Sequence, residues 1–380
     1  MNKKLLTVYD DVDPLNNVIS PLTIEADEIF YVYHHDIPDS SFENIAKVLL
    51  RYRDIRINFI KLIDDSRQLN EIFSQNEGIV VDVGGARYLS LLLFETVKDK
   101  ENQIIYYDDD ENVIKDYRSH SIIYHDVFKL QIEDVLNLRG GEIKEYMHRS
   151  AEDGKSRNAI ISLFEKNMDN YGSFIRFLTR LNSLINNRDY MGSNTYQLSE
   201  GDRFDLMSDA VYDKVSDLFT IDEKNRLRFS TRKLKEMVSV SGAFLENYLY
   251  IKLTESGKFD DVKMSTVIDF SDDKYIYPVR CEIDCLIIKN NKLLFVSCKS
   301  SKADASTLNE IYVHNHRFGN VLSLPVLCVC EELDRKYPST YAKGEELGIY
   351  LVDRSSFVNG DICDVFSSIL DGTYVYDKVS

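Results

Sequence analysis

Two apolar segments near residue 290, in the sequence CEIDCLIIKNNKLLFVSCK, carry four side chains suited to phosphodiester chemistry. They flank Asn290-Asn291, and a two-residue Asn-Asn loop suits the positive φ angles of a tight hairpin turn. In that register Asp284 faces Ser297 and Glu282 faces Lys299, with Cβ atoms about 4.5–5.5 Å apart. Two carboxylates, a hydroxyl and an ammonium would then converge. Such a group could hold a divalent metal ion and a water molecule oriented by the lysine.

Side-chain alternation predicts that Glu282 and Asp284 share one face of the first strand, and that Cys281, Ile283 and Cys285 share the other. An opposed Glu and Lys can also be a simple surface ion pair, worth less than about 1 kcal/mol. The neighbouring CLII and LLFV are strongly apolar, however, so the hairpin is expected to be central in its sheet. Charges in a buried strand need a reason. The sequence leaves both interpretations open.

Length, composition and charge limit the possible functions. The chain has 380 residues, 44% hydrophobic and 29% charged, which suits a soluble globular protein of two or three domains. Its net charge of −17 argues against coating nucleic acid through a basic surface, but not against an enzyme that acts on it at a local site. No apolar run approaches the ~20 residues of a membrane span. Six cysteines without a CxxC pair favour buried thiols in a reducing cytoplasm.

Residues 4 to about 135 alternate strand patterns with helices of about a dozen residues, which predicts a parallel, Rossmann-like sheet. Gly84-Gly85-Ala86-Arg87 follows a buried strand and opens a helix, at the edge where open α/β domains bind ligands. Glycines allow close approach and a helix N-terminus favours phosphate, although such a turn is more often only a turn. Asp11 and Asp13 follow the first strand at the same edge. Neither GxGxxG nor a Walker loop is present.

The rest of the chain divides into two further parts. Residues 146–235 are mainly helical in period and are expected to form a helical connector between the domain of residues 1–145 and that of residues 236–380. The last domain begins with a helix containing Glu246, continues with a strand and the central hairpin, and ends with alternating helices and strands. The predicted fold class is therefore α/β in both outer domains.

Asp284, followed thirteen residues later by Ser297-Cys298-Lys299, resembles the PD-(D/E)xK, or restriction-endonuclease-like, nuclease core. Ser297 stands where most of that superfamily has Glu or Gln, and a hydroxyl is a poorer Mg²⁺ ligand than a carboxylate. Another acid must then help. Glu246, in SGAFLENYLYIKL, is the candidate, since a Leu-Glu pair occupies this helix in the family described next.

Nearly the whole chain resembles the CRISPR ancillary nucleases that join an N-terminal CARF (CRISPR-associated Rossmann-fold) sensor to a C-terminal PD-(D/E)xK nuclease. The resemblance is carried by the Gly84-Gly85 turn, the segment LQIEDVLNLRGGEI, and the Leu-Glu, Glu-Ile-Asp, Ser-Cys-Lys, Leu-Asn-Glu and Glu-Leu-Gly-Ile motifs. It implies a homodimer that binds a cyclic oligoadenylate, typically cyclic tetra-adenylate, and then cuts DNA or RNA with Mg²⁺ or Mn²⁺. The residues expected to line the activator are Asp11, Asp13, Gly84, Gly85, Ala86 and Arg87.

On this resemblance, Asp284 and Glu246 are the main metal ligands and Glu282 is a weaker candidate. Lys299 orients the attacking water or offsets charge on phosphorus, and Ser297 adds a hydrogen bond or a contact through water. The alternatives are a ligand-sensing regulator with a vestigial nuclease site, favoured by Ser297 and the net acidity, and a nuclease that needs no activator. We expect a cytoplasmic protein with no membrane partner.

Overall fold

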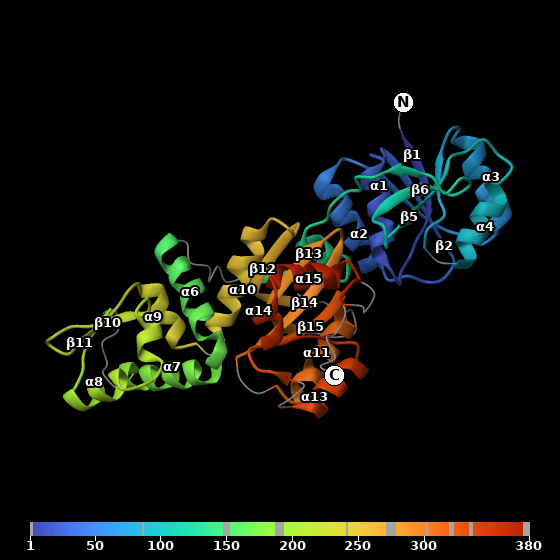
Figure 1. Cartoon of the computed structure of the whole chain (residues 1–380). Coiled ribbons are helices and arrows are strands. Elements are labelled where there is room, and N and C mark those ends of the chain that lie inside the picture. Colours follow the sequence, from blue (N-terminus) through green and yellow to red (C-terminus); the bar gives the residue numbers. More distant parts are fainter. Residues whose placement is uncertain are drawn as a thin grey trace.

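The computed structural model describes residues 3–85, 87–146, 153–186, 194–240, 242–270, 279–300, 303–318, 323–333 and 337–374. Figure 1 shows three parts: an N-terminal α/β domain, a second α/β domain built from the C-terminal residues, and a smaller insert carried on the second domain. Each part has a sheet of its own. None of the described helices combines the length and the apolar character that crossing a membrane requires.

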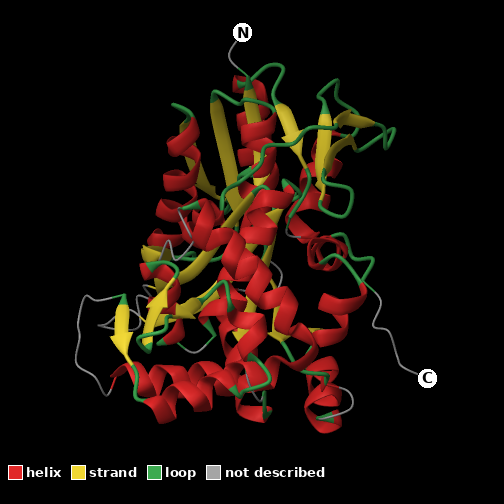
Figure 2. Ribbon diagram, turned by 60° about the vertical axis from the view of Figure 1, so that its left-hand side comes forward, coloured by secondary structure: helices red, strands yellow, loops and turns green. Residues whose placement is uncertain are grey.

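The N-terminal domain has a sheet in the order β3-β2-β1-β4-β5-β6-β7. Its first five strands in this order are parallel, which confirms the predicted Rossmann-like arrangement, and β6 and β7 extend it with antiparallel pairs. Helices cover both faces (Figure 2). The elements are β1 (Lys4–Val8), η1 (Pro14–Asn17), α1 (Ile19–Thr23), β2 (Glu28–Tyr33), α2 (Asp39–Tyr52), β3 (Arg56–Lys61), α3 (Asp65–Gln75), β4 (Val80–Asp82), α4 (Arg87–Val97), β5 (Ile104–Asp108), β6 (Val113–Asp116), β7 (Ile122–Tyr124) and α5 (Ile132–Leu138).

The smaller insert, which the sequence predicted as a helical connector over residues 146–235, is not entirely helical. Three strands of three or four residues form a sheet in the order β10-β11-β9, with Tyr196 and Leu227 buried on its inner face and Arg228 exposed on its outer face. Strands this short fall below the length at which alternation can be read from sequence. The elements are α6 (Gly154–Asn167), η2 (Met168–Asn170), α7 (Tyr171–Asn186), β9 (Thr195–Gln197), α8 (Glu200–Met207), η3 (Tyr212–Val215), β10 (Phe219–Ile221), β11 (Arg226–Phe229) and α9 (Arg232–Val238).

The C-terminal domain has a six-stranded sheet in the order β16-β15-β14-β13-β12-β8. Its edge strand β8 (Gly141–Tyr146) precedes the insert in sequence and pairs antiparallel with β12, so the chain enters this sheet before residue 145. Strands β14, β15 and β16 are parallel. The other elements are α10 (Ala243–Ser256), β12 (Asp261–Phe270), β13 (Val279–Lys289), β14 (Lys292–Lys299), α11 (Ala305–Phe318), β15 (Ser323–Val329), α13 (Pro338–Glu346), β16 (Tyr350–Val352), α14 (Arg354–Asn359) and α15 (Ile362–Leu370).

The predicted hairpin is confirmed, with Lys289 paired to Lys292. Asn290 and Asn291 have φ angles of 51° and 63°, as a tight turn with two left-handed residues requires. The turn also joins the two domains. The buried Asn291 side chain accepts a hydrogen bond from Leu130 N (2.8 Å) and donates one to Phe128 O (2.9 Å). The tip of the hairpin is therefore fixed to the end of the N-terminal domain.

The predicted side-chain alternation along β13 is wrong at one point. Cys281 and Ile283 pack in the apolar cluster that contains Leu286, whereas Cys285 packs in the cluster on the other side of the sheet, with Ile287. A regular strand would place Cys281, Ile283 and Cys285 on one face. The alternation thus shifts by one residue at Asp284. The residues on either side of Asp284 point to opposite faces of the sheet, so the direction of its own side chain does not follow from regular alternation.

Candidate active site and activator site

The carboxylate of Asp284 lies where the β13–β14 ladder ends. Its Oδ2 accepts a hydrogen bond from the backbone N of Cys298 (2.6 Å) and from Ser297 Oγ (3.4 Å). Burial raises the pKa of Asp284, while the Cys298 hydrogen bond and the positive charge of Lys299 lower it, and the charge of Glu282 raises it further. The hairpin therefore brings together the four side chains that the sequence singled out. A cation beside Asp284 would favour its ionised form.

Glu246 lies in the first turn of α10 and is only 7% exposed. Gly242 caps this helix with a φ of +85°, and a Cβ atom at Gly242 would lie 2.9 Å from Glu246 Oε1. Glycine is therefore needed here both for the backbone and for room. Burial raises the pKa of the Cys285 thiol, and the charges of Asp284 and Glu246 both add to that rise. The charges of both carboxylates thus act on the same buried thiol.

Ser265 binds one of the two carboxylates and lies level with the other, and sequence reasoning missed it. Its hydroxyl donates to Glu246 Oε2 (3.2 Å), and it lies between Met264 and Thr266, which pair with Cys285 and Ile283. It is thus level with Asp284 on the neighbouring strand. Its φ of +44° departs from strand geometry, at the level where β13 is irregular. The only sequence signal is a serine in an otherwise apolar strand.

The donor set fits a divalent metal ion with a preference for oxygen. The carboxylates of the buried Glu246 and the half-buried Asp284, with the Ser265 hydroxyl bound to the first, are the hard oxygen groups that suit Mg²⁺ or Mn²⁺. Glu282 is exposed, in contrast to both. Among the described residues, the ligand atoms of Glu246, Glu282 and Asp284 do not all lie within 4.8 Å of one another. Two carboxylates are therefore the core of the candidate metal site.

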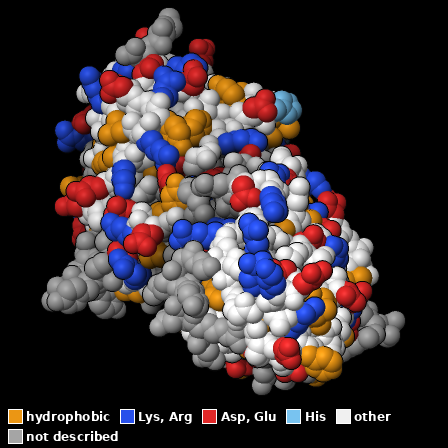
Figure 3. Space-filling model, turned by 90° about the vertical axis from the view of Figure 1, so that its left-hand side faces the viewer, with side chains coloured by type: hydrophobic (Ala, Val, Ile, Leu, Met, Phe, Trp, Pro, Cys, Tyr) orange, Lys and Arg blue, Asp and Glu red, His pale blue; other side chains and the backbone are white. Residues whose placement is uncertain are grey.

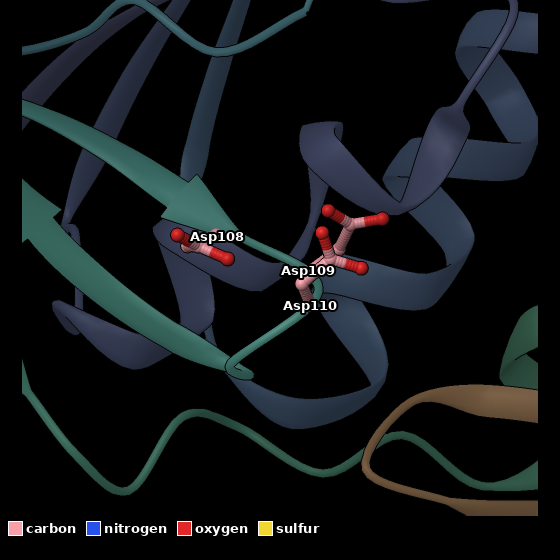
Figure 4. Close-up of side chains that lie close together, drawn as sticks. All are labelled: Asp108, Asp109 and Asp110. Carbon is pink, nitrogen blue, oxygen red and sulfur yellow. The ribbon is translucent and has the colours of Figure 1, made fainter. Parts of the chain in front are cut away.

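Three other acids, Asp108, Asp109 and Asp110, have carboxylate oxygens within 4.8 Å of one another. They lie at the end of β5 and in the turn that follows it in the N-terminal domain (Figure 4). Asp108 pairs with Lys115 at 2.7 Å, and this hydrogen bond holds the pKa of Asp108 below its usual value. Asp109 and Asp110 are exposed. A paired acid and two solvated ones need no metal ion, so we read this turn as a surface loop.

At the other candidate site, the loop after β1 touches the turn after β4. Asp10, a buried residue that sequence reasoning left out of the site, organises the loop by accepting hydrogen bonds from the N atoms of Val12 and Asp13 (both 2.9 Å). Gly85 has a φ of +88°, and a Cβ atom there would lie 3.2 Å from Asp10 Cβ. Strands β1 and β4 are parallel neighbours, so their carboxyl ends form the edge where ligands of open sheets bind.

The remaining residues predicted for the activator site lie at this edge. Asp11 Oδ2 is 3.1 Å from His35 Nε2. Asp13 caps η1 by accepting from Leu15 N, and burial raises its pKa to about 6. Gly84 N donates to Asp82 Oδ1 (2.9 Å). Ala86 and the side chain of Arg87 lie outside the described residues.

Comparisons with known proteins agree with this architecture. Residues 235–315 match a family model described as "Card1-like, endonuclease domain". Protein VC1899 from Vibrio cholerae has the same fold, with a TM-score of 0.77 and 16% identity over 98% of both chains. Can2 from Sulfobacillus thermosulfidooxidans, solved in complex with cyclic tetra-adenylate, has a TM-score of 0.70 and 16% identity over 96% of this chain and 98% of its own. No curated protein sequence matches.

The protein thus joins a Rossmann-like domain to a second α/β domain that contains a region similar to the Card1-like endonuclease family. Its overall fold is that of VC1899 and Can2, which agrees with the fold class that the sequence predicted. The region that matches the endonuclease model begins within α9 and includes Glu246, Asp284 and Lys299.

Replacing Ser265 by alanine removes the hydrogen bond to Glu246, so we expect the apparent affinity for Mn²⁺ to fall about 10- to 100-fold, as when partners of metal ligands are lost. The measurement is the rate of strand cleavage against Mn²⁺ concentration. The control is Thr266→Val, because the buried Thr266 hydroxyl has no partner among the described residues. An unchanged Mn²⁺ dependence in Ser265→Ala would exclude this role.

Proposed function

We propose that the protein is a metal-dependent endonuclease of type III CRISPR antiviral defence that is activated by cyclic oligoadenylate, with cyclic tetra-adenylate as the expected ring. It cuts DNA or RNA phosphodiesters with little sequence preference. The observation that carries the proposal is the hydrogen bond from Ser265, level with Asp284, to Glu246. It holds the Glu246 carboxylate at the level of Asp284, whose strand pairs with the strand that ends in Lys299. The Card1-like endonuclease region supports the same activity.

We assign the residues of the site the following roles. A bound Mg²⁺ or Mn²⁺ would lower the pKa of the attacking water and offset negative charge on the phosphate. Glu246 and Asp284 hold that ion, and Ser265 orients Glu246. Ser297 and the Cys298 backbone hold the Asp284 carboxylate in place. Lys299, whose charge acts on Asp284, orients the attacking water and stabilises the negative charge that develops on the phosphoryl oxygens.

Activation is proposed to take place across a homodimer, with one cyclic tetra-adenylate bound by the loops of both copies at Gly84, Gly85, Asp11 and Asp13. A two-fold ring on a two-fold axis needs only one kind of half-site. The complex of Can2 with this ring supports the choice of activator. On α4, directly after Gly85, Tyr88 and Leu91 are 64% and 60% exposed and lie one helical turn apart, which suits contact with a second copy.

The deciding experiment is cleavage of single-stranded DNA, single-stranded RNA and supercoiled plasmid with Mn²⁺, with and without cyclic tetra-adenylate. We expect cleavage only when the activator is present, and the polymer that is cut identifies the substrate. Equal cleavage without the ring would refute activation, and cleavage of no polymer would refute the nuclease.

The second candidate is a ligand-sensing regulator with a vestigial nuclease site. Ser297, in place of an acid, and the net charge of −17 favour it. It predicts that the ring binds in calorimetry while no polymer is cut at any Mn²⁺ concentration, with Asp284→Ala behaving like the unaltered protein.

A further inference from the structure

The insert differs in charge from the rest of the protein. Residues 154–238 contain 14 Lys and Arg against 12 Asp and Glu, whereas the whole chain has a net charge of −17. Figure 3 shows the side of the molecule on which the insert lies, and several Lys and Arg side chains gather near the middle of that face. In a strongly acidic protein, a part with a small positive charge is the place where a polyanion is least repelled.

The insert is packed firmly against the catalytic domain. Phe164 of α6 stacks on Tyr248 of α10, the helix that carries Glu246, with ring centroids 4.0 Å apart. In the first turn of α7, Phe174 packs edge-to-face on Phe244, which lies in the first turn of α10 beside Glu246, with ring centroids 5.4 Å apart. Helix α7 therefore begins next to the candidate metal site and carries its later residues away from it.

A polar cavity of about 460 Å³ lies along α7 and extends to η3. Arg176 donates to Ser173 Oγ (2.8 Å), and its Nη1 and the Glu331 carboxylate both lie within 4 Å of the position of a Cβ on Gly172. Within the described part of the chain, Arg176 and Lys214 form no ion pairs, whereas Arg180 pairs with Asp205 at 2.7 Å. The polar residues that line the cavity include Asn167, Asn170, Arg176, Arg180, Asp209 and Lys214.

We propose that this cavity binds the sugar–phosphate backbone of the nucleic-acid strand that is being cut. It would hold the part of the strand directly next to the nucleotides in the catalytic site. The inference rests on the proposed nuclease function. Guanidinium, ammonium and amide groups are the side chains that contact phosphate and sugar in nucleic-acid complexes. Arg176 and Lys214, the two lining cations without ion pairs among the described residues, come from two different elements, α7 and η3, so they can contact two parts of one strand.

The cavity also accounts for how so acidic a protein can hold a polyanion. A short cationic path beside the site supplies binding without a basic surface, and contacts to backbone phosphates carry no sequence information. Such binding agrees with the low sequence preference that we propose. Asp209, which lies in the same lining, uses its carboxylate to accept from Val211 N (2.9 Å), so this acid is engaged locally.

The test uses the full-length protein with Arg176→Ala and Lys214→Ala combined. The matched control is Arg228→Ala, because Arg228 is an exposed arginine on the outer face of the insert sheet, outside the cavity. Binding of fluorescent 20-nucleotide single-stranded DNA and RNA is measured with cyclic tetra-adenylate and without divalent metal, from 50 to 200 mM salt. Cleavage kinetics are then measured with Mn²⁺, on these strands and on bis(p-nitrophenyl) phosphate, which is too small to reach the cavity.

We expect the double variant to bind at least one of the two polymers about tenfold more weakly, and its slope of log K against log salt to fall by about 1.4, or about 0.7 for each lost phosphate contact. KM for the strand should rise while kcat and the hydrolysis of bis(p-nitrophenyl) phosphate stay within about twofold. Equal weakening in Arg228→Ala, or an unchanged salt slope in the double variant, would overturn the inference. Failure of the nuclease proposal would give a different result, because the unaltered protein would then cleave no polymer. The slope of log K against log salt would still decide whether the cavity binds the strand.

Discussion

Lys299→Ala should lower the rate of strand cleavage by at least about 10²–10³-fold and leave the binding of the activator unchanged. This is the range observed when a group that stabilises developing charge is removed. Burial raises the pKa of Asp284, and the charge of Lys299 is one of the effects that oppose the rise. The variant therefore loses an aligned ammonium and also makes the Asp284 carboxylate harder to ionise.

The matched control is Lys292→Ala, because Lys292 lies on the same hairpin, opposite Lys289 and seven residues from Lys299. Cleavage is followed on labelled strands with Mn²⁺ and activator, and binding of cyclic tetra-adenylate by calorimetry. An unchanged rate of strand cleavage in Lys299→Ala would show that Lys299 has no part in the reaction. Loss of both cleavage and activator binding would break the assignment of the two functions to two domains.

The second large effect is expected at the activator site. Gly85→Ala should weaken the binding of cyclic tetra-adenylate about 10- to 100-fold and reduce activated cleavage in proportion. Gly85 has a φ of +88°, and a Cβ atom there would lie 3.2 Å from Asp10 Cβ, closer than ordinary packing allows. Asp10 holds the N atoms of Val12 and Asp13, so its displacement would disturb the loop that we expect to contact the ring.

Gly78→Ala separates this effect from simple backbone strain. Gly78 has a φ of +71°, in the same left-handed region, but a Cβ atom there would meet nothing within 4 Å. Both variants should lose about 1 kcal/mol of folding stability in thermal denaturation. Only Gly85→Ala should lose affinity for the activator in calorimetry. Equal affinities in the two variants would remove the β4 turn from the binding site.

The parts of the fold that were predicted correctly depend on local patterns. The hairpin and its register follow from Asn290-Asn291, because two adjacent asparagines tolerate the left-handed conformation that the turn requires. The parallel sheet of the N-terminal domain follows from strands that alternate with helices of about a dozen residues. The Gly84-Gly85 turn was placed at the correct edge for the same reason.

What could not be predicted depends on contacts between distant residues. Strand β8 pairs with β12, more than a hundred residues later, and nothing in GEIKEY specifies that partner. The contribution of Ser265 arises from a left-handed residue inside a strand, opposite the point where β13 shifts its alternation. Period-two patterns assume a regular strand, so they fail where two strands are irregular at the same level. That level is the candidate active site.

The fixed tip of the hairpin has a mechanical consequence. Asn291 is bound to the N-terminal domain through Leu130 N and Phe128 O, and Lys299 lies at the far end of β14, eight residues or about 26 Å away. One end of the strand is thus held by the N-terminal domain, and the other end carries the lysine that we propose to be catalytic. A tilt of the strand by about 5° at its held end would move the far end by about 2 Å, and about 1 Å of misplacement costs an enzyme up to about 10²-fold in rate. On the proposed function, a small rotation of the N-terminal domain that is transmitted along β14 would move Lys299 far enough to change the rate of cleavage.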